Sequence, residues 1–348
     1  MRDDTSPIRD EERFDELRVG AYLREVIPEL GSSAPLEFAQ FQGGHANLTY
    51  VVSSGALELV LRRPPLGEVA PGAHDMAREH KVLSVLHQSY PLAPQAFHYC
   101  GDASILGKPF FVMERRKGTV VRGRWPESMP DDAGLRRTVA SSLVDAIGSL
   151  HQVAFEPLGL ADLGRPDGFV DRQVAGWTDR WNRARDELNP DMERLAAALA
   201  DGSPAPQRAS IIHNDFKLDN TMLSTDGQVT AVFDWDMSTI GDPLVDLGTT
   251  LSYWDGPDEV AVVVPPDGQV LGGVFGVDEI VSRYQQQTGL DCSNIDWYRA
   301  LASFRIAVIL QQIYIRYARG QTTDERFSAL GAVVGPIAAA GLAQLAAN

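Results

Sequence analysis

Four polar residues near the middle of the chain have types and spacing that could support catalysis. His213, Asp215 and Asn220 follow the order H-x-D-x-x-x-x-N, and Asp234 comes directly after the short apolar stretch 229–233. Phosphoryl transfer from ATP requires a protein mainly to place charge. One carboxylate must accept or orient the proton of the attacking hydroxyl, and Asp215 fits that role. A second carboxylate and an amide oxygen must hold Mg²⁺ beside the phosphates, and Asn220 and Asp234 fit because this cation prefers oxygen ligands.

Loop propensity offers a simpler explanation for each of these residues taken alone. Asn and Asp favour turns, so a single one of them would be interpreted as a polar loop residue. Four fixed residue types in one order, placed between short strands, favour the catalytic interpretation. His213 is interpreted as a structural hydrogen-bonding residue, because the neighbouring Asp215 already supplies the base.

The elements that must position these residues change character along the chain. Residues 1–35 are polar, with apolar side chains near helical spacing, which predicts an N-terminal helical extension. Residues 36–115 are expected to form a small lobe of antiparallel sheet. Its predicted strands are 48–52, 58–61 and 109–114, and its predicted helix is 74–87.

Residues 116–348 are expected to form a larger, mainly helical lobe. The predicted helices are 135–151, 169–188, 243–254, 277–287, 297–317 and the C-terminal tail. A compact β-rich insert, 211–234, interrupts these helices and carries the catalytic residues. The sequence therefore predicts an α+β protein with two lobes, a small antiparallel-sheet lobe and a larger helical lobe, with a cleft between them.

Composition narrows the range of partners and compartments. The 348 residues include 31 Lys+Arg and 47 Asp+Glu, a net charge of −16, which argues against nucleic acid because phosphate backbones are bound by clustered Lys and Arg. Cys100 and Cys292 form no C-x-x-C pair, so no disulfide framework is expected and a reducing, cytoplasmic compartment fits best. The apolar stretch 327–343 is interrupted by glycine and proline, so it is expected to be a buried helix pair and no membrane segment is predicted. The sequence carries no signal for the oligomeric state.

Longer stretches around the catalytic residues resemble a known family. HNDFKLDN, VFDWD and GDPLVDLG, in that order, are similar to the aminoglycoside phosphotransferase and choline kinase family, which has a protein-kinase-like fold. GGHANLTY, LVLRRPP, AHDMAREHKVL and GKPFFVMERRKG resemble the branch of that family whose domains are found fused to acyl-CoA dehydrogenases. The resemblance covers residues 36–320, and no dehydrogenase domain is expected within this chain.

The resemblance implies roles for individual residues. It implies that Asp215 is the catalytic base, that Asn220 and Asp234 bind Mg²⁺, and that Asp246 is a buried structural carboxylate beneath the catalytic loop. Glu79 would pair with the basic residue of the preceding strand. The ATP phosphates would be covered by Gly43, Gly44, His45, Ala46 and Asn47, and the adenine would contact the backbone of Met113, Glu114 and Arg115, which makes 36–115 the nucleotide-binding lobe.

One residue departs from the pattern of most kinases. Arg62 stands where most kinases have lysine. Arginine keeps the positive charge and can bind phosphate oxygens through two nitrogens, but it is longer and planar. The same arginine is usual in the branch that the chain resembles, so an active enzyme is favoured. The alternative is a catalytically silent nucleotide-binding module of the same fold.

The expected phosphate acceptor is the hydroxyl of a small molecule. Only a short loop separates Asp234 from the helix that carries Asp246, which leaves no room for the long activation segment of a protein kinase. The acceptor would be bound by the helices after Asp246 and by the segment 162–191. The resemblance suggests a hydroxylated acyl thioester or another small alcohol, and an aminoglycoside or choline-like acceptor stays open.

Overall fold

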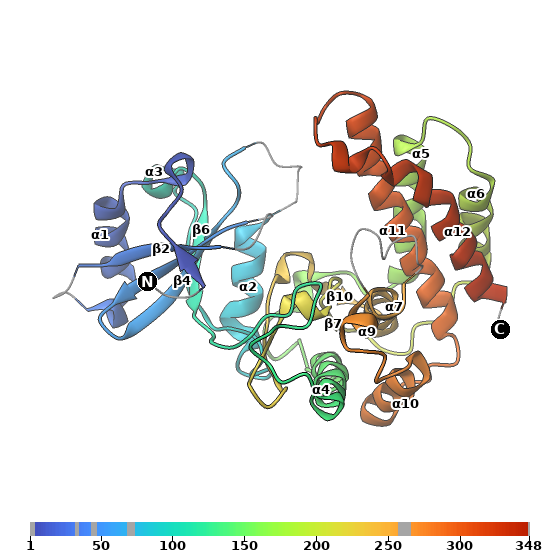
Figure 1. Ribbon diagram of the computed structural model, residues 1–348, viewed down its shortest axis with the longest axis horizontal. Coiled ribbons are helices and arrows are strands. Elements are labelled where there is room, and N and C mark those ends of the chain that lie inside the picture. The colour runs from blue at the N-terminus through green and yellow to red at the C-terminus, as the bar shows by residue number, and fades with distance from the viewer. Residues whose placement is uncertain (1–3, 32–34, 43–46, 68–73, 257–265, 347–348) are drawn as a thin grey trace. The chain divides into compact units, whose positions relative to one another are not determined.

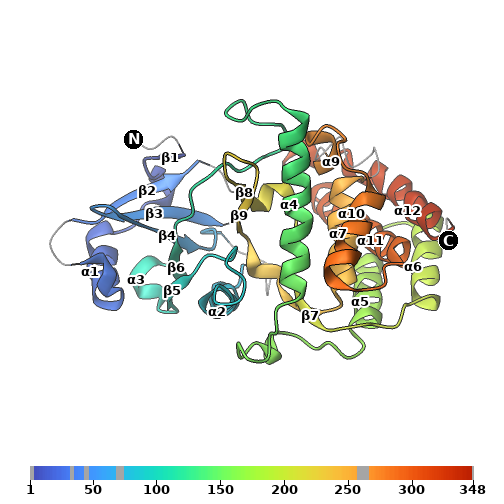
Figure 2. The same cartoon turned by 90° about the horizontal axis from the view of Figure 1, so that it is seen from below.

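The computed structural model describes residues 4–31, 35–42, 47–67, 74–256 and 266–346 (Figure 1, Figure 2). The chain divides into two compact units. The smaller unit comprises Met1–Gly118 and Thr230–Met237, and the larger unit comprises Thr119–Val229 and Ser238–Asn348. The chain therefore returns briefly to the smaller unit, in the segment that carries Asp234, before it completes the larger one.

The smaller unit is built on a six-stranded antiparallel sheet. Its strands are β1 (Thr5–Ser6), β2 (Glu37–Phe41), β3 (Leu48–Ser54), β4 (Leu57–Arg63), β5 (Ala96–Cys100) and β6 (Phe110–Glu114), in the order β1-β2-β3-β4-β6-β5. The expected hairpin is present, with Ser54 opposite Leu57 and Leu48 opposite Arg63. Gly55 in its turn has a φ of +60°, a left-handed conformation that glycine adopts without a steric penalty. The sheet predicted for 36–115 is therefore confirmed.

The N-terminal residues join this sheet and its core. β1 pairs with β2, and α1 (Glu16–Val26) contributes Val19 and Leu23 to a buried apolar cluster that includes Tyr50. The helix occupies only part of 1–35, because Pro28 follows shortly after it. The structure groups these residues with the smaller unit.

Two further helices complete the described part of the smaller unit. α2 (Met76–Leu86) lies within the range expected for it, and Asp75 caps its first turn by accepting from the backbone N–H of Arg78 at 3.0 Å. α2 buries Glu79 together with Val82 and Leu83, so one carboxylate enters an otherwise apolar face. α3 (Ala103–Leu106) is a single turn between β5 and β6.

The larger unit is mainly helical. Its helices are α4 (Ala133–His151), α5 (Phe169–Ala184), α6 (Pro190–Asp201), α7 (Pro243–Trp254), α9 (Asp267–Val270), α10 (Val277–Thr288), α11 (Ile295–Ala318) and α12 (Leu330–Ala346). α11 packs against α5, α6, α7 and α12, and Figure 1 shows it among them. Gly248 permits the close approach of α7 to α11, because a Cβ there would lie 2.7 Å from the backbone of Tyr298. The helices predicted from periodicity are present, with ends that differ by a few residues, and α6 is an addition.

Four short strands lie between α6 and α7, in the part of the chain that carries Asp215, Asn220 and Asp234. β7 (Ser210–Ile212) pairs with β10 (Thr239–Gly241). Between them in the sequence, β8 (Thr221–Leu223) and β9 (Val229–Val232) form a separate two-stranded sheet. A turn closed by the Ser224 N–H and the Gln228 carbonyl at 2.9 Å joins β8 to β9. The predicted β-rich insert is therefore present.

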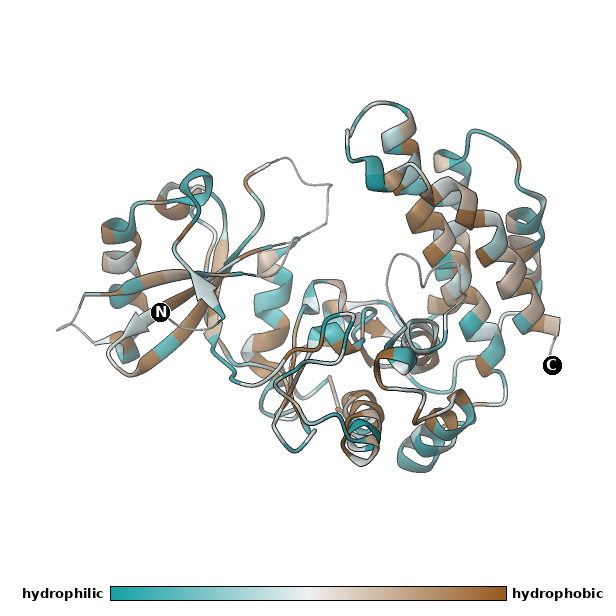
Figure 3. Cartoon of the chain, viewed as in Figure 1, coloured by the Kyte–Doolittle hydropathy of each residue, from teal (hydrophilic) through white to brown (hydrophobic). Residues whose placement is uncertain are grey.

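The C-terminal apolar stretch forms one helix, where the sequence predicted a pair. α12 packs against α11 and α6, and it contains Pro336. Figure 3 shows the apolar character of this segment. Within the described residues, Glu325–Ala346 is the one helical stretch long and apolar enough to cross a membrane, with a mean hydropathy of 1.7. In its 18-residue apolar window 28% is buried inside the structure, and core helices and signal sequences satisfy the same criteria of length and composition.

Candidate active site

A buried carboxylate supports the loop that carries Asp215 in the larger unit. Asp246 lies in the first turn of α7 and is fully buried. Its Oδ2 accepts from the backbone N–H of His213 at 2.6 Å, and its Oδ1 accepts from that of Asn214 at 2.7 Å. Burial alone would raise the pKa of Asp246, but the hydrogen bond and charge of His151, 3.1 Å away, outweigh burial and lower the pKa. The burial and the loop contacts implied for Asp246 are therefore present.

The backbone turns sharply just before Asp215. Asn214 has a φ of 65°, in the left-handed region that asparagine tolerates better than most residues. The backbone N–H of Asp215 lies 3.3 Å from Nδ1 of His213, which is fully buried. His213 thus occupies a hydrogen-bonding position next to the loop, in agreement with the structural interpretation of this residue.

Three donors surround the carboxylate of Asp215. The Tyr253 hydroxyl donates to Oδ1 at 2.8 Å, and Nδ2 of Asn220 donates to Oδ2 at 2.8 Å. Nζ of Lys217 lies 3.0 Å from the same Oδ2. The Asp215 side chain is 19% exposed, so a ligand can still reach it. The three donors stabilise an ionised carboxylate and fix its orientation.

Tyr253 keeps the proton that it donates to Asp215. It lies near the end of α7, one helical turn beyond Thr249. Burial and the neighbouring charge of Asp215 raise the pKa of Tyr253 well above its usual range, so the hydroxyl keeps its proton at neutral pH. Lys217 also contacts this residue, with Nζ 5.1 Å from the centre of the phenol ring.

A second carboxylate holds the other end of the same loop. Asp267, at the start of α9, accepts from the backbone N–H of Leu218 at 2.8 Å. Burial raises the pKa of Asp267 to about 7, in spite of that hydrogen bond. The loop between His213 and Asn220 is therefore held by backbone hydrogen bonds to two carboxylates from distant parts of the larger unit.

The smaller unit contains a compact charge cluster around Arg62. Nη1 of Arg62 lies 3.2 Å from Oε1 of Glu79, and Nη2 pairs with Oδ1 of Asp234. Burial alone would lower the pKa of Arg62, but the two carboxylates outweigh burial and raise it. Burial raises the pKa of Glu79 to about 7; the charge of Arg62 opposes this rise, and the charge of Asp234 adds to it. The pairing of Glu79 with the strand arginine, which the resemblance implied, is confirmed.

One of the five expected phosphate-binding residues can be placed. Asn47 is buried next to Arg62. With its amide oriented to suit both neighbours, Asn47 accepts from Nη2 of Arg62 at 2.6 Å and donates to Nδ1 of His74 at 2.9 Å. Gly43, Gly44, His45 and Ala46 lie outside the described residues.

The residues expected to contact adenine lie at the end of β6. Met113 is buried, and the backbone N–H of Glu114 donates to the carbonyl of Gln95 at 2.8 Å. The Arg115 side chain pairs with Asp4 at 2.8 Å and with Glu58 at 3.0 Å. The N–H of Glu114 is thus already used within the unit, which removes one of the backbone groups expected to contact the adenine.

The expected magnesium ligands are chemically suitable but belong to different units. Asn220 in the larger unit uses its Nδ2 on Asp215, which leaves its amide oxygen for another ligand. Asp234 in the smaller unit has a side chain that is 29% exposed and a φ of 67°. No group of three or more His, Cys, Asp or Glu among the described residues could hold a metal alone. One amide oxygen and one carboxylate suit Mg²⁺, which keeps waters and substrate phosphates as its other ligands.

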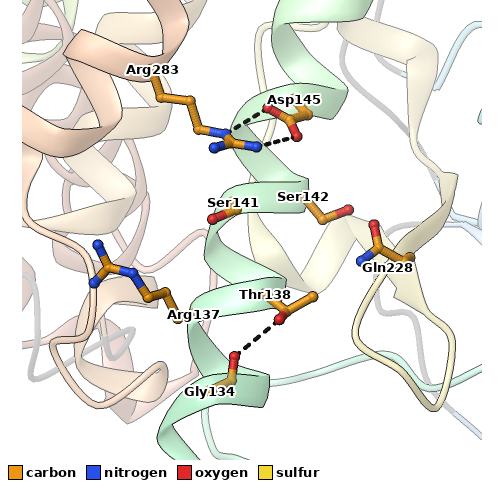
Figure 4. A pocket seen from close by; sticks show the side chains of 8 residues that line it. All are labelled: Gly134, Arg137, Thr138, Ser141, Ser142, Asp145, Gln228 and Arg283. Carbon is orange, nitrogen blue, oxygen red and sulfur yellow. Dashed lines mark hydrogen bonds and ion pairs between the residues drawn. The ribbon is translucent and has the colours of Figure 1, made fainter.

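A polar pocket on α4 is lined by none of the residues that the sequence predicted for the active site. It has a volume of about 370 Å³, and Figure 4 shows Ser141, Thr138 and two arginines along its wall. Arg283 pairs with Asp145 at 2.6 Å, and Arg137 pairs with Glu279 at 2.5 Å. Both cations are therefore neutralised by the protein itself.

Three residues that contact Asp215 or hold its loop were not identified from the sequence. Lys217 lies inside the motif, two residues after Asp215, and its spacing could have suggested it. Tyr253 lies near the end of α7, which begins at Pro243, and one aromatic residue on a mostly buried helix gave only a weak signal. Asp267 carried no local signal, because its contact with Leu218 depends on tertiary structure.

Comparisons with known proteins show the family to which the chain belongs. The family profile described as "Phosphotransferase enzyme family" matches residues 37–266. Acyl-CoA dehydrogenase family member 11 of Gallus gallus is 31% identical over 97% of this chain, and that of Rattus norvegicus is 32% identical over 97%. In both cases the match covers 44% of the relative, so the chain spans less than half the length of these curated relatives.

Solved structures share the fold over nearly the whole chain. A putative aminoglycoside phosphotransferase from Ralstonia eutropha is 29% identical, with a TM-score of 0.80 over 95% of this chain and 98% of its own. A thermostable aminoglycoside phosphotransferase mutant in complex with ADP and hygromycin B, at 14% identity and a TM-score of 0.60, covers 94% of this chain and 98% of its own and shares the fold. The fold is thus the two-lobed, kinase-like α+β fold that was expected. The chain belongs to the phosphotransferase enzyme family, which includes the aminoglycoside phosphotransferases.

Proposed function

We propose that the protein transfers the γ-phosphoryl group of ATP to the hydroxyl of a small molecule, with Asp215 as the general base. The observation that carries this proposal is the Asp215 carboxylate, held by Tyr253, Asn220 and Lys217 yet 19% exposed. An ionised, oriented and accessible carboxylate is what a general base requires. The fold shared with a phosphotransferase that holds ADP and an aminoglycoside supports the same reaction class.

In the proposed reaction, Asp215 takes the proton of the acceptor hydroxyl. The acceptor oxygen forms a bond to the γ-phosphorus, the bond from that phosphorus to the bridging oxygen of ATP breaks, and ADP leaves with the electron pair. Asn220 and Asp234 would hold Mg²⁺, which neutralises charge on the phosphates when it is bound. Lys217 keeps a positive charge beside the base and limits the accumulation of negative charge there.

Arg62 would contribute to nucleotide binding only after an exchange of partners. Its guanidinium is engaged by Glu79, Asp234 and Asn47. If Mg²⁺ takes the carboxylate of Asp234, a nitrogen of Arg62 becomes available to a phosphate oxygen. The pairing of Arg62 with Asp234 also supports a second candidate function. In that case the protein is a catalytically silent nucleotide-binding module, and Arg62 and Asp234 stay paired.

The substitution Asp215→Asn tests the proposed function. Removing the charge that accepts the proton should lower turnover 10²-fold or more. The fold should persist, because the Tyr253 hydroxyl can turn and accept from the new amide while the amide oxygen still accepts from Asn220. ATP binding, measured by calorimetry, should stay within about threefold of the wild type, since Asp215 acts on the acceptor.

Steady-state transfer of labelled γ-phosphate to hydroxyacyl thioesters, choline-like alcohols and aminoglycosides supplies the rate. ATP binding without transfer to any of these acceptors would favour the silent module. Wild-type transfer by Asp215→Asn would remove Asp215 from the mechanism.

A further inference from the structure

A buried guanidinium in the larger unit has no carboxylate partner among the residues that the structure describes. Arg305, in the middle of α11, is 5% exposed. Nη1 donates to the hydroxyl of Thr249 at 3.0 Å, and within the described part of the chain no carboxylate lies within the 4 Å of an ion pair. Burial lowers the pKa of Arg305, which reflects the cost of an incompletely compensated charge. Its Nε and Nη2 have no hydrogen-bond partner among the described residues.

A second guanidinium lies beside the first. Cζ of Arg180, on α5, is 4.3 Å from the centre of the Trp177 ring, and Cζ of Arg305 is 5.5 Å from the same centre. Arg180 is exposed and, among the described residues, also lacks an ion pair. The indole attracts both cations, but each cation also repels the other. Within the described residues neither arginine has an ion pair, although the chain carries a net charge of −16.

Other arginines of this protein are satisfied in one of two ways. The buried Arg63 donates to the backbone carbonyls of Leu106 and Glu12 and to the Tyr50 hydroxyl, and several other arginines pair with an acid. In the α4 pocket, Arg283 has Asp145 and Arg137 has Glu279. The carboxylates that act on Arg305 at longer range, Asp215 and Asp246, are already engaged by other donors. The positive charge shared by Arg305 and Arg180 is therefore not neutralised at close range by the described protein.

This positive charge lies close to the proposed base. Thr249 and Tyr253 are four residues apart on α7, so their side chains share one face, with Cβ atoms about 5–6 Å apart. Thr249 binds Arg305, and Tyr253 binds Asp215. One molecule of modest length could therefore reach both the base and the guanidinium.

We propose that Arg305 and Arg180, which share the Trp177 ring, form a subsite for an oxyanion carried by the same molecule that presents its hydroxyl to Asp215. This inference rests on the proposed function, because it describes the acceptor of that reaction. A carboxylate or a phosphate group has the oxygen geometry that the planar guanidinium binds through two nitrogens. A polycationic acceptor is disfavoured, because its charge repels both arginines.

Matched four-carbon probes test the subsite by calorimetry without ATP. The probes are 4-hydroxybutyrate, 4-hydroxybutyl phosphate, 1,4-butanediol and 4-amino-1-butanol, which keep the hydroxyl and change the charge at the other end. At least one anion should bind the wild type tenfold or more tightly than the diol. The anion that binds more tightly shows whether the subsite prefers a carboxylate or a phosphate. The amine should bind more weakly than the diol.

Substitutions locate the preference. Arg305→Gln should bring the anions to the affinity of the diol and leave the diol unchanged. Arg180→Gln, at an exposed position that does not endanger folding, should reduce the preference several-fold. Arg316→Gln removes an exposed arginine from the same helix and should change nothing. Arg305→Lys keeps the charge without the fork and should fall between the wild type and Arg305→Gln.

The outcomes are distinguishable from those of the proposed function. Equal affinity for the anions and the diol, no binding of either anion, or an unchanged preference in both arginine variants overturns the subsite. Anion preference without transfer of phosphate to any acceptor refutes the proposed function and keeps the subsite. Transfer of phosphate to acceptors without any preference for the anions keeps the proposed function and overturns the subsite.

Discussion

Arg62 in the smaller unit and Arg305 in the larger unit are both buried, but their surroundings differ in charge. Arg62 is 8% exposed and contacts two carboxylates, Glu79 and Asp234. Arg305 is 5% exposed and contacts a hydroxyl and an indole. Burial costs free energy for any charge, and a partner or a ligand must offset that cost.

The difference separates two ways in which a buried cation can serve a site. Arg62 is neutralised before any ligand arrives, so its cluster is stable alone and a nucleotide must displace a carboxylate to use it. Arg305 is not neutralised at close range, so the protein accepts a cost that an anionic ligand can remove. The first arrangement contributes to the stability of the unit, whereas the second favours binding.

Arg62→Ala should produce the largest effect of this comparison. It leaves Glu79 and Asp234 facing each other without a cation, and breaking a buried pair in this way should lower the free energy of unfolding by about 3 kcal/mol. The ATP concentration needed for half-maximal binding should also rise at least tenfold. Urea unfolding followed by circular dichroism measures the first effect, and calorimetry with ATP measures the second.

Arg62→Lys is the matched control for this prediction. It restores the charge without the planar fork, so it should recover part of the stability and part of the ATP affinity. Wild-type stability and ATP affinity in Arg62→Ala would show that the cluster is not the neutralised pair described here.

Asp267 extends the comparison to a carboxylate that forms no ion pair with any described residue. It is half-buried, and burial raises its pKa to about 7, whereas an unfolded aspartate ionises near 3.9. Between these two values the folded state holds a proton that the unfolded state has lost, so stability falls as the pH rises toward 7. Asp267→Asn removes this titration. Relative to the wild type, the variant should therefore gain about 1–2 kcal/mol between pH 5 and pH 8, after allowance for partial exposure.

Urea unfolding of both proteins at pH 5, 6, 7 and 8 measures the change. Because the amide oxygen can still accept from the N–H of Leu218, the loop should keep its position and turnover at pH 7 should change little. A constant difference in stability across the four pH values would show that Asp267 is ionised throughout.

The sequence predicted most of the fold and the motif around Asp215, because both depend on local patterns. Hydrophobic periodicity located α4, α7, α10 and α11, and the order of Asp215, Asn220 and Asp234 is the basis of the reaction that we propose. The helix α6 was missed although Asn189 and Pro190 form a typical helix start, with the Asn189 side chain accepting from two backbone N–H groups. That signal was available in the sequence.

Other features could not be predicted, because they depend on packing between distant segments. β1 is a two-residue strand that exists only because β2 lies beside it. Arg305 is one of several polar residues on a long apolar helix, and only the packing of α11 against α5 and α7 brings it to Trp177 and Thr249. The surroundings of a buried charged residue such as Arg305 were therefore the least predictable from the sequence, because they come from segments far away along the chain.

Arg305→Met should produce the smallest change in stability, which is what separates Arg305 from Arg62. No buried carboxylate loses its partner, and Thr249 stays satisfied because its hydroxyl also donates to the carbonyl of Val245 at 2.8 Å. The loss of the interaction with the Trp177 ring costs about 0.5–1 kcal/mol, and the removal of an incompletely compensated buried charge offsets it. The free energy of unfolding should therefore stay within about 1 kcal/mol of the wild type in urea titrations without a ligand. With 4-hydroxybutyrate present, the wild type should become more stable and Arg305→Met should not, because only the wild type binds the anion. A loss of stability as large as that of Arg62→Ala would mean that the folded protein already neutralises Arg305, and the two arginines would then be equivalent.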